Sequence, residues 1–223
     1  LTDRAGMMLS PKSLGPDISA KPVCSGPYQF VERVQNDRIV LEKFKGHWEA
    51  DKYQFDRVIY RAIPDTTVRL ANLRAGELDM LERLAPTDVK SAQGDKNLKV
   101  QGIVNLGYQG ITINTNNGDA ANQPMGKDKR VRQALSLSID RKVLSQVVFE
   151  GLYAPMNQPF NPGNQYLSAA LPVPERDVAK AKALLKEAGQ SKVTVELFVT
   201  NNPVDAQLGQ VIQAMAQEAG IDI

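Results

Sequence analysis

Few side chains in this sequence have the types and spacing that catalysis requires. General acid–base chemistry needs a positioned pair of titratable groups, and one cluster of carboxylates in the sequence is Asp65, Glu77, Asp79 and Glu82. The surrounding pattern predicts that these carboxylates cap a helix or lie on the surface around it. The sequence also lacks a nucleophile elbow, a phosphate-binding loop and a zinc-protease motif. We therefore predict that the chain is not an enzyme and needs no cofactor.

A metal site is the second chemistry to consider. His47 is the only histidine and Cys24 the only cysteine, so the sequence has no cluster of the ligands that metal sites need. His47 precedes Trp48, and this pair could form a metal or aromatic site. The alternative is that Trp48 packs the neighbouring strands against the rest of their lobe. We predict no metal, and we expect Cys24 to be a small packed residue.

The composition is typical of a globular protein. Of the 223 residues, 42% are hydrophobic and 23% are charged, which argues against wholesale disorder. The net charge of +2 is too small to indicate a nucleic-acid-binding surface. No apolar run reaches the length of about 18 residues that a membrane span needs. The final residues read as a helix and the start of a strand, so we expect a piece of a longer protein.

The first half of the chain is rich in predicted strands. Alternating and β-branched residues predict a β-hairpin over 28–34 and 38–44, joined by a Gln-Asn-Asp turn. Asp65 or Thr66 can cap a helix over 67–75. The remaining elements expected here are strands over 55–63, 78–81, 98–104 and 108–115 and a short helix over 86–93.

The second half has the pattern of an α/β structure. Val131, Leu135 and Ile139 recur at four-residue spacing, which predicts one apolar stripe on a helix over 130–139. Asp140 has a side chain suited to capping the next helix. The further expected elements are helices over 141–150, 176–188 and 205–219 and a strand over 192–200, with an irregular proline-rich stretch before the 176–188 helix.

The segment after residue 130 carries two short motifs, Val-Arg-Gln-Ala-Leu from Val131 and Ile-Asp-Arg from Ile139. They resemble a signature helix of solute-binding protein family 5, the extracytoplasmic dipeptide- and oligopeptide-binding proteins that feed ABC importers. Further matches follow in the family's order: Ser25-Gly26-Pro27-Tyr28, Arg69 through Asp79, Ile113-Asn114, Ala154-Pro155 and Ala179 through Gly189. Cys24 and Ser25 depart from the family's usual Gly-Thr. The matches extend from about Ala5 to Ile223.

The resemblance implies an α/β, periplasmic-binding-protein-like fold of class II, with two lobes and mixed sheets flanked by helices. Residues 1–113 would form part of the first lobe, and residues 114–223 the first part of the second. The implied function is the substrate-binding receptor of an ABC importer, which captures a peptide or related small solute between its lobes. The alternative is a non-transport receptor or chaperone-like scaffold that reuses the fold.

The resemblance also implies partners and a location. We expect a monomer in the periplasm or at the cell surface, with a signal peptide in a preceding part of the protein. The partners would be the solute and the ABC permease subunits in the membrane, and no nucleic acid.

Three residues near the implied hinge are candidates for ligand contact: Tyr108, Asn114 and Asn116. Tyr108 lies between Gly107 and Gly110, whose small size permits close backbone approach; the alternative is an ordinary half-buried strand tyrosine. Asn114 and Asn116 could offer amides to a ligand, but asparagines after a strand also commonly form turns.

Overall fold

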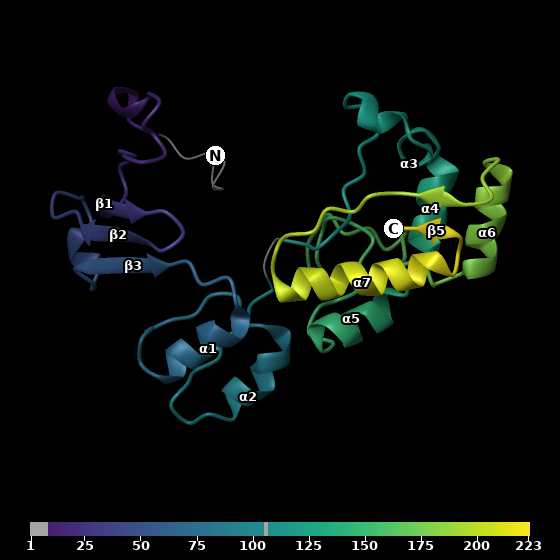
Figure 1. Ribbon diagram of the computed structural model, residues 1–223. Helices are drawn as coiled ribbons and strands as arrows, with labels where there is room; N and C mark the ends of the chain where they lie inside the picture. Colours follow the sequence, from purple (N-terminus) through teal and green to yellow (C-terminus); the bar gives the residue numbers. More distant parts are fainter. Residues whose placement is uncertain (1–8, 105–106) are drawn as a thin grey trace. The chain divides into compact units, whose positions relative to one another are not determined.

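The computed structural model describes residues 9–104 and 107–223. The chain divides into two compact units, Leu1–Pro64 and Asp65–Ile223. The first unit contains strands β1 to β3, and the second contains the α-helices together with β4 and β5 (Figure 1). The predicted lobe boundary between residues 113 and 114 lies within the second unit and stays a prediction.

The first unit is built on a three-stranded antiparallel sheet in the order β1-β2-β3. Its strands are β1 (Tyr28–Val34), β2 (Arg38–Lys43) and β3 (Arg57–Arg61). The β1–β2 turn places Asn36 at a φ of 61°, a left-handed conformation that asparagine tolerates. The predicted hairpin and third strand are therefore confirmed. Two short 3-10 helices complete the described part of this unit: η2 (Pro11–Ser13) and η3 (Ala50–Lys52).

The second unit begins with two helices that an arginine side chain links. Helix α1 (Thr66–Arg74) starts at Asp65, whose Oδ1 accepts hydrogen bonds from the N–H groups of Thr67 at 2.8 Å and Val68 at 3.0 Å. The Arg74 guanidinium donates to Ser91 Oγ at 2.8 Å. Ser91 lies in α2 (Val89–Gln93), which follows the 3-10 helix η4 (Pro86–Asp88). The predicted helices over 67–75 and 86–93 are thus confirmed, the second as a 3-10 turn leading into a short α-helix.

The larger part of the second unit packs helices around a small parallel sheet (Figure 1). Strands β4 (Val193–Thr194) and β5 (Ile221–Asp222) pair in parallel, and α7 (Pro203–Gln217) connects them, as parallel pairing requires a crossover. The other elements are η5 (Asp119–Asn122), α3 (Pro124–Lys127), α4 (Lys129–Ser138), α5 (Arg141–Phe149) and α6 (Val178–Glu187).

The apolar stripe predicted on α4 is the centre of this core. Val131 and Ala134 are 0% exposed, and Leu135 is 6% exposed. The stripe belongs to one buried cluster that includes Leu185 of α6 and Ile221 of β5. Burial of such side chains, at roughly 25 cal/mol per Å² of apolar surface, is the main force that joins helices to the sheet.

Asp140 caps the N-terminus of α5, as the sequence predicts. Its Oδ1 accepts hydrogen bonds from the N–H groups of Lys142 and Val143, both at 3.0 Å. These two N–H groups have no partner within α5. The capping interaction therefore stabilises the first turn of α5.

Replacing Asp140 by alanine is expected to lower the free energy of unfolding by about 1 kcal/mol, because the capping bonds are lost. Asp88→Ala is the matched control, since Asp88 occupies the N-cap position of α2 without a side-chain capping bond. Urea unfolding of both variants measures the difference. Equal destabilisation by the two substitutions would contradict the capping role of Asp140.

Three of the predicted strands in the first half are wrong: residues 78–81, 98–104 and 108–115 are not in strands. A strand needs a hydrogen-bonded neighbour, and no neighbour pairs with these segments within the described residues. Some of their apolar side chains are correspondingly exposed, with Met80 at 81% and Ile103 at 83%.

The predicted strands over 108–115 and 192–200 have the expected alternation of buried and exposed side chains, but they form little or no hydrogen-bonded pairing with another strand. Ile111 and Ile113 pack against the core while their neighbours are exposed, yet the structure assigns no strand there. Only Val193 and Thr194 of the second segment are in a strand, because the partner strand β5 is itself two residues long.

Candidate functional site

Residues 107–117 carry the three candidate contact residues and rest on the core of the second unit. Ile111 and Ile113 face that core, so the intervening and flanking side chains point away from it. Tyr108 is 64% exposed, which differs from the half-buried strand tyrosine of the alternative interpretation. Its ring lies beside Gly110, where a Cβ atom would be 3.2 Å from ring atom Cε2. The ring therefore has free surface, as a ligand contact requires.

Asn114 folds the chain after Ile113 into a turn. Its Oδ1 accepts a hydrogen bond from the N–H of Asn117 at 2.8 Å, and its Nδ2 donates to the carbonyl oxygen of Asn117 at 2.8 Å. Both polar atoms of this amide are thus engaged within the turn, which is the turn-forming role that the sequence left open. Asn116 lies between the two and is exposed.

The Asn114 turn is held against α3 by a glycine that the sequence analysis did not single out. A Cβ on Gly126 would lie 2.8 Å from the carbonyl oxygen of Asn114 and 2.4 Å from that of Ala121. Only glycine permits this approach. Arg132 of α4 then donates to the carbonyl oxygens of Met125 at 3.1 Å and Gly126 at 2.8 Å. No local sequence pattern signals these long-range contacts.

Asp128 and Arg130 join α4 to α6. Asp128 caps α4 by accepting from the N–H of Arg130 at 2.8 Å, and its Oδ2 lies 2.6 Å from Arg130 Nη2. Arg130 Nη1 also donates to the carbonyl oxygen of Glu187 at the end of α6, at 2.7 Å. The hydrogen bonds from the Arg130 side chain to Asp128, followed by the bond from the Arg130 backbone N–H, lower the pKa of Asp128 from 3.8 to about 2.

The Asp128 carboxylate is expected to stabilise the fold in a pH-dependent way. Because its pKa is lower in the folded state, the contribution is present above pH 3.8 and is lost as the pH falls toward 2. Asp128→Asn should therefore unfold at lower urea concentration than the parent near neutral pH, with a smaller difference at about pH 2. A difference that is the same at both pH values would contradict this role.

The Ile139-Asp140-Arg141 motif also has a structural role. Arg141 Nη1 donates to the carbonyl oxygen of Ser136 at 3.0 Å, and Nη2 donates to Ser136 Oγ at 2.8 Å. Burial lowers the pKa of the Arg141 guanidinium below its ordinary value. Arg176 donates from Nε to the carbonyl oxygen of Ser138 at 2.8 Å. The signature residues thus close the C-terminal end of α4 and orient the helix pair.

His47 and Trp48 form a stacked aromatic pair, with ring centroids 3.9 Å apart. His47 is 7% exposed, and its Nδ1 accepts a hydrogen bond from the N–H of Glu49 at 3.1 Å. Trp48 is 76% exposed, so the expectation that it packs the strands against their lobe is wrong: it covers His47 instead. Across the described part of the chain, no group of three or more His, Cys, Asp or Glu side chains could hold a metal ion.

Cys24 is exposed, so the expectation that it is packed is wrong as well. It lies in the connection before β1, where the described residues include no buried side chain.

None of the helices in the described part of the chain has the length and apolar character that a membrane span requires.

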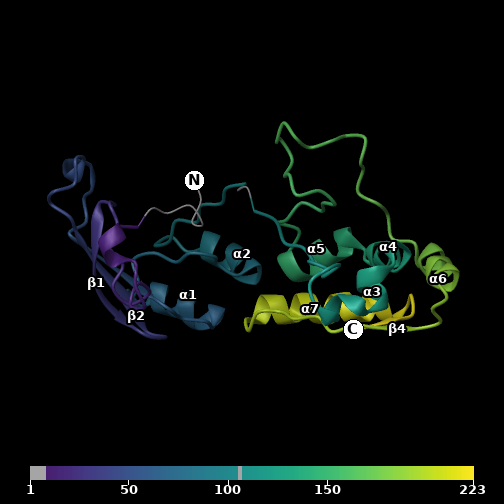
Figure 2. The same ribbon diagram turned by 90° about the horizontal axis from the view of Figure 1, so that it is seen from above.

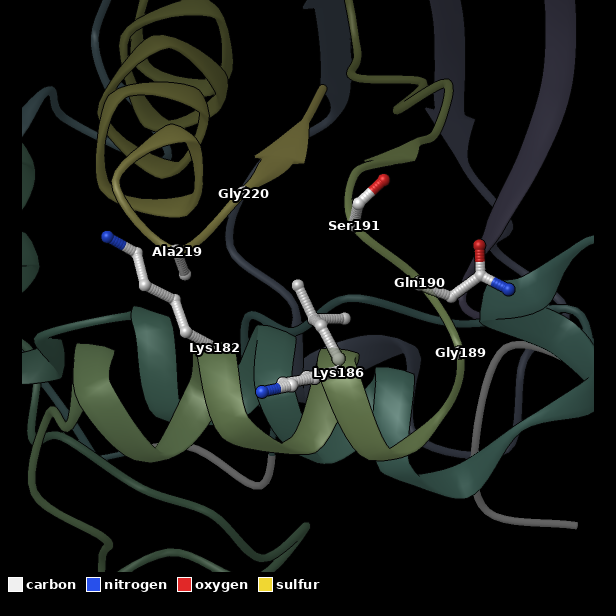
Figure 3. A pocket seen from close by; sticks show the side chains of 8 residues that line it. Lys182, Lys186, Gly189, Gln190, Ser191, Ala219 and Gly220 are labelled. Atoms are coloured by element: carbon white, nitrogen blue, oxygen red, sulfur yellow. The ribbon is translucent and has the colours of Figure 1, made fainter.

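A surface hollow of about 470 Å³ lies between the end of α6, the loop before β4 and the turn before β5 (Figure 3). Lys182 and Lys186 line it on the α6 side, and Ala219 and Gly220 on the other. A lysine in the last turn of a helix is favoured by the negative end of the helix dipole. This accounts for Lys186, which lies in the last turn of α6, but not for Lys182, which lies near the middle of the helix.

Comparison with known proteins gives the family. Residues 9–223 match the family of bacterial extracellular solute-binding proteins, family 5 Middle. The chain is 31% identical to the glutathione-binding protein GsiB of Pectobacterium atrosepticum, across 100% of this chain and 43% of that protein. It is also 31% identical to the probable di/tripeptide-binding protein 5 of Pseudomonas aeruginosa, across 92% of this chain and 38% of that protein.

Solved structures show the same fold. DppA from Helicobacter pylori in complex with the peptide STSA has a TM-score of 0.75 and 29% identity, covering 91% of this chain and 38% of that one. NikA from Staphylococcus aureus in complex with Ni(L-His)2 has a TM-score of 0.77 and 25% identity, covering 97% and 45%.

The chain belongs to family 5 of the bacterial extracellular solute-binding proteins. The expected fold class, that of class II periplasmic binding proteins, is likewise confirmed. The chain spans about two fifths of the length of the curated relatives it matches.

Proposed function

We propose that this chain is part of the substrate-binding receptor of an ABC importer for peptides or related small solutes. The observation that carries the proposal is the family match over residues 9–223, together with relatives named for binding glutathione and di/tripeptides. The protein would act outside the cytoplasm as a monomer without enzymatic activity. It would deliver its solute to permease subunits in the membrane.

Residues 107–117 are the part of the chain that we propose to contact the solute. Tyr108 offers an exposed aromatic face, and Asn116 an exposed amide. Asn114 acts from within the turn, where its amide fixes the backbone that carries Asn116. A site held by a rigid base loses less conformational entropy when a ligand binds. The packing of Ile111 and Ile113 on the core supplies that base.

Transport by such a receptor depends on the solute binding the closed form better than the open form. A ligand with equal affinity for both forms would shift nothing, however tightly it binds. We propose residues 1–113 and 114–223 as parts of the two lobes that close, with the 107–117 stretch at their junction.

A thermal-shift screen of the full-length protein tests the proposed substrate class. The panel contains dipeptides, tripeptides, glutathione, longer peptides and a nickel–histidine complex. A ligand at a hundred times its dissociation constant should stabilise the protein by about 2.7 kcal/mol. Stabilisation by one class supports the proposal and names the solute. No stabilisation by any of them would favour a non-transport scaffold.

A further inference from the structure

The segment between α5 and α6 is long and has no core of its own. Figure 2 shows it projecting away from the helices. Residues 151–175 contain no helix, no strand and no buried residue. Hydrophobic burial therefore contributes little to its order, and fixing each backbone residue costs roughly 1–2 kcal/mol of conformational entropy. Other interactions must hold the segment in one shape.

Both ends of the segment are tied to the helices. At the start, Ser145 Oγ of α5 donates to the carbonyl oxygen of Tyr153 at 2.6 Å, and the ring of Tyr153 stacks on Phe149 with centroids 4.3 Å apart. At the end, the N–H of Asp177 donates to the carbonyl oxygen of Leu137 at 2.8 Å. These contacts leave the residues between about 157 and 172 to be ordered locally.

Gln158 makes three hydrogen bonds across that middle part. Its Nε2 donates to the carbonyl oxygens of Ser168 at 2.9 Å and Leu171 at 3.0 Å. Its Oε1 accepts from the N–H of Ser168 at 3.0 Å. The side-chain amide thus binds both backbone groups of Ser168, as the backbone of a neighbouring strand would.

The neighbouring contacts reinforce the same closure. Asn157 Nδ2 donates to the carbonyl oxygen of Pro172 at 2.9 Å. Inside the closed loop, the rings of Phe160 and Tyr166 lie with centroids 5.6 Å apart. The chain therefore returns on itself between Asn157 and Pro172, and Gln158 makes the most bonds across the gap.

We infer that the Gln158 side-chain amide fixes the conformation of the 157–172 loop before any ligand or partner binds. We call its three hydrogen bonds to Ser168 and Leu171 the Gln158 clasp. The loop is held by side-chain amides to its own backbone, and not by packing on the helices. This inference does not depend on the proposed function. The loop is then a preformed surface element that opens when the Gln158 side-chain amide is removed.

Hydrogen exchange of the full-length protein, measured at the Ser168 amide, tests the clasp. Gln158→Ala should speed exchange there by about tenfold or more, because this N–H loses its acceptor and the loop its closure. Gln158→Met, which keeps the length of the side chain without its amide, should give the same increase. The thermal unfolding midpoint should stay unchanged in both variants, since the loop buries no side chain.

Gln165→Ala is the matched control, because Gln165 is an exposed glutamine of the same loop. Unchanged exchange at Ser168 in this control, with faster exchange in both Gln158 variants, supports the clasp. Protection that survives in Gln158→Met would show that packing of the side chain orders the loop, and would overturn the inference. Equal acceleration by Gln165→Ala would overturn it too.

Discussion

Replacing Gly126 by alanine should destabilise the second unit by about 1–3 kcal/mol, the usual cost of overpacking. The added Cβ would lie 2.4 Å from the carbonyl oxygen of Ala121 and 2.8 Å from that of Asn114. Both atoms belong to the backbone, so neither can move aside by a change of rotamer. The chain must shift at α3 or at the Asn114 turn. Urea unfolding measures the loss, and amide chemical shifts of Asn114 and Asn117 report whether the turn moves.

Gly102→Ala is the control for this substitution. A Cβ at Gly102 would meet nothing within 4 Å, and Gly102 is not among the glycines with positive φ. Its free energy of unfolding should stay within a few tenths of a kcal/mol of the parent or rise slightly. If Gly126→Ala also leaves the free energy of unfolding unchanged, α3 and the Asn114 turn do not lie as close together as described.

Replacing Tyr108 by alanine should weaken solute binding by about tenfold, the effect of removing a moderate aromatic contact. The ring is 64% exposed in this chain, so its loss should change stability little. Tyr108→Phe keeps the ring surface and should retain most of the affinity if the contact is apolar. Titration of each variant with the solute found in the screen gives the dissociation constants.

The matched control is Tyr60→Ala, because Tyr60 is a tyrosine of similar exposure, 58%, in the other unit. Affinity should be unchanged in this variant. If Tyr108→Ala binds the solute as tightly as the parent, Tyr108 does not face the ligand and the proposed contact surface must lie elsewhere.

The elements that the sequence predicted best are those with local physical causes. Val131, Leu135 and Ile139 repeat with the period of a helix, and all three are buried. Asp140 is a capping residue by its chemistry alone, and the capping bonds are present. Gly76 and Gly189 follow helices with φ of 79° and 73°, as left-handed C-terminal positions require.

The elements that failed depend on partners distant in the sequence. The segments 78–81, 98–104 and 108–115 form no strand, and 192–200 forms one only at Val193–Thr194, because a strand exists only where another strand supplies its hydrogen bonds. Ile111 and Ile113 still find the core, so the alternation was informative about burial and not about pairing. Trp48 was expected to pack the hairpin against its lobe, yet it is exposed and stacks on His47.

The candidate site was only partly accessible from the sequence. The segment that holds Tyr108, Asn114 and Asn116 could be chosen from the family resemblance. The division of roles between a turn-forming Asn114 and an exposed Asn116 could not, because it depends on which amide reaches Asn117. The sequence around Gly126 and Gln158 did not indicate the roles of these residues. Both roles depend on backbone atoms that only the fold brings close to them.

The most direct test of the account is a calorimetric titration of the full-length protein with glutathione, a tripeptide and a dipeptide. A solute receptor should bind at least one of them saturably, with one ligand per protein and a dissociation constant in the micromolar range or below, near −8 kcal/mol. Binding should also bury apolar surface and give a negative heat-capacity change. The absence of saturable binding to these ligands and to mixed peptide pools would contradict the proposed role in solute capture.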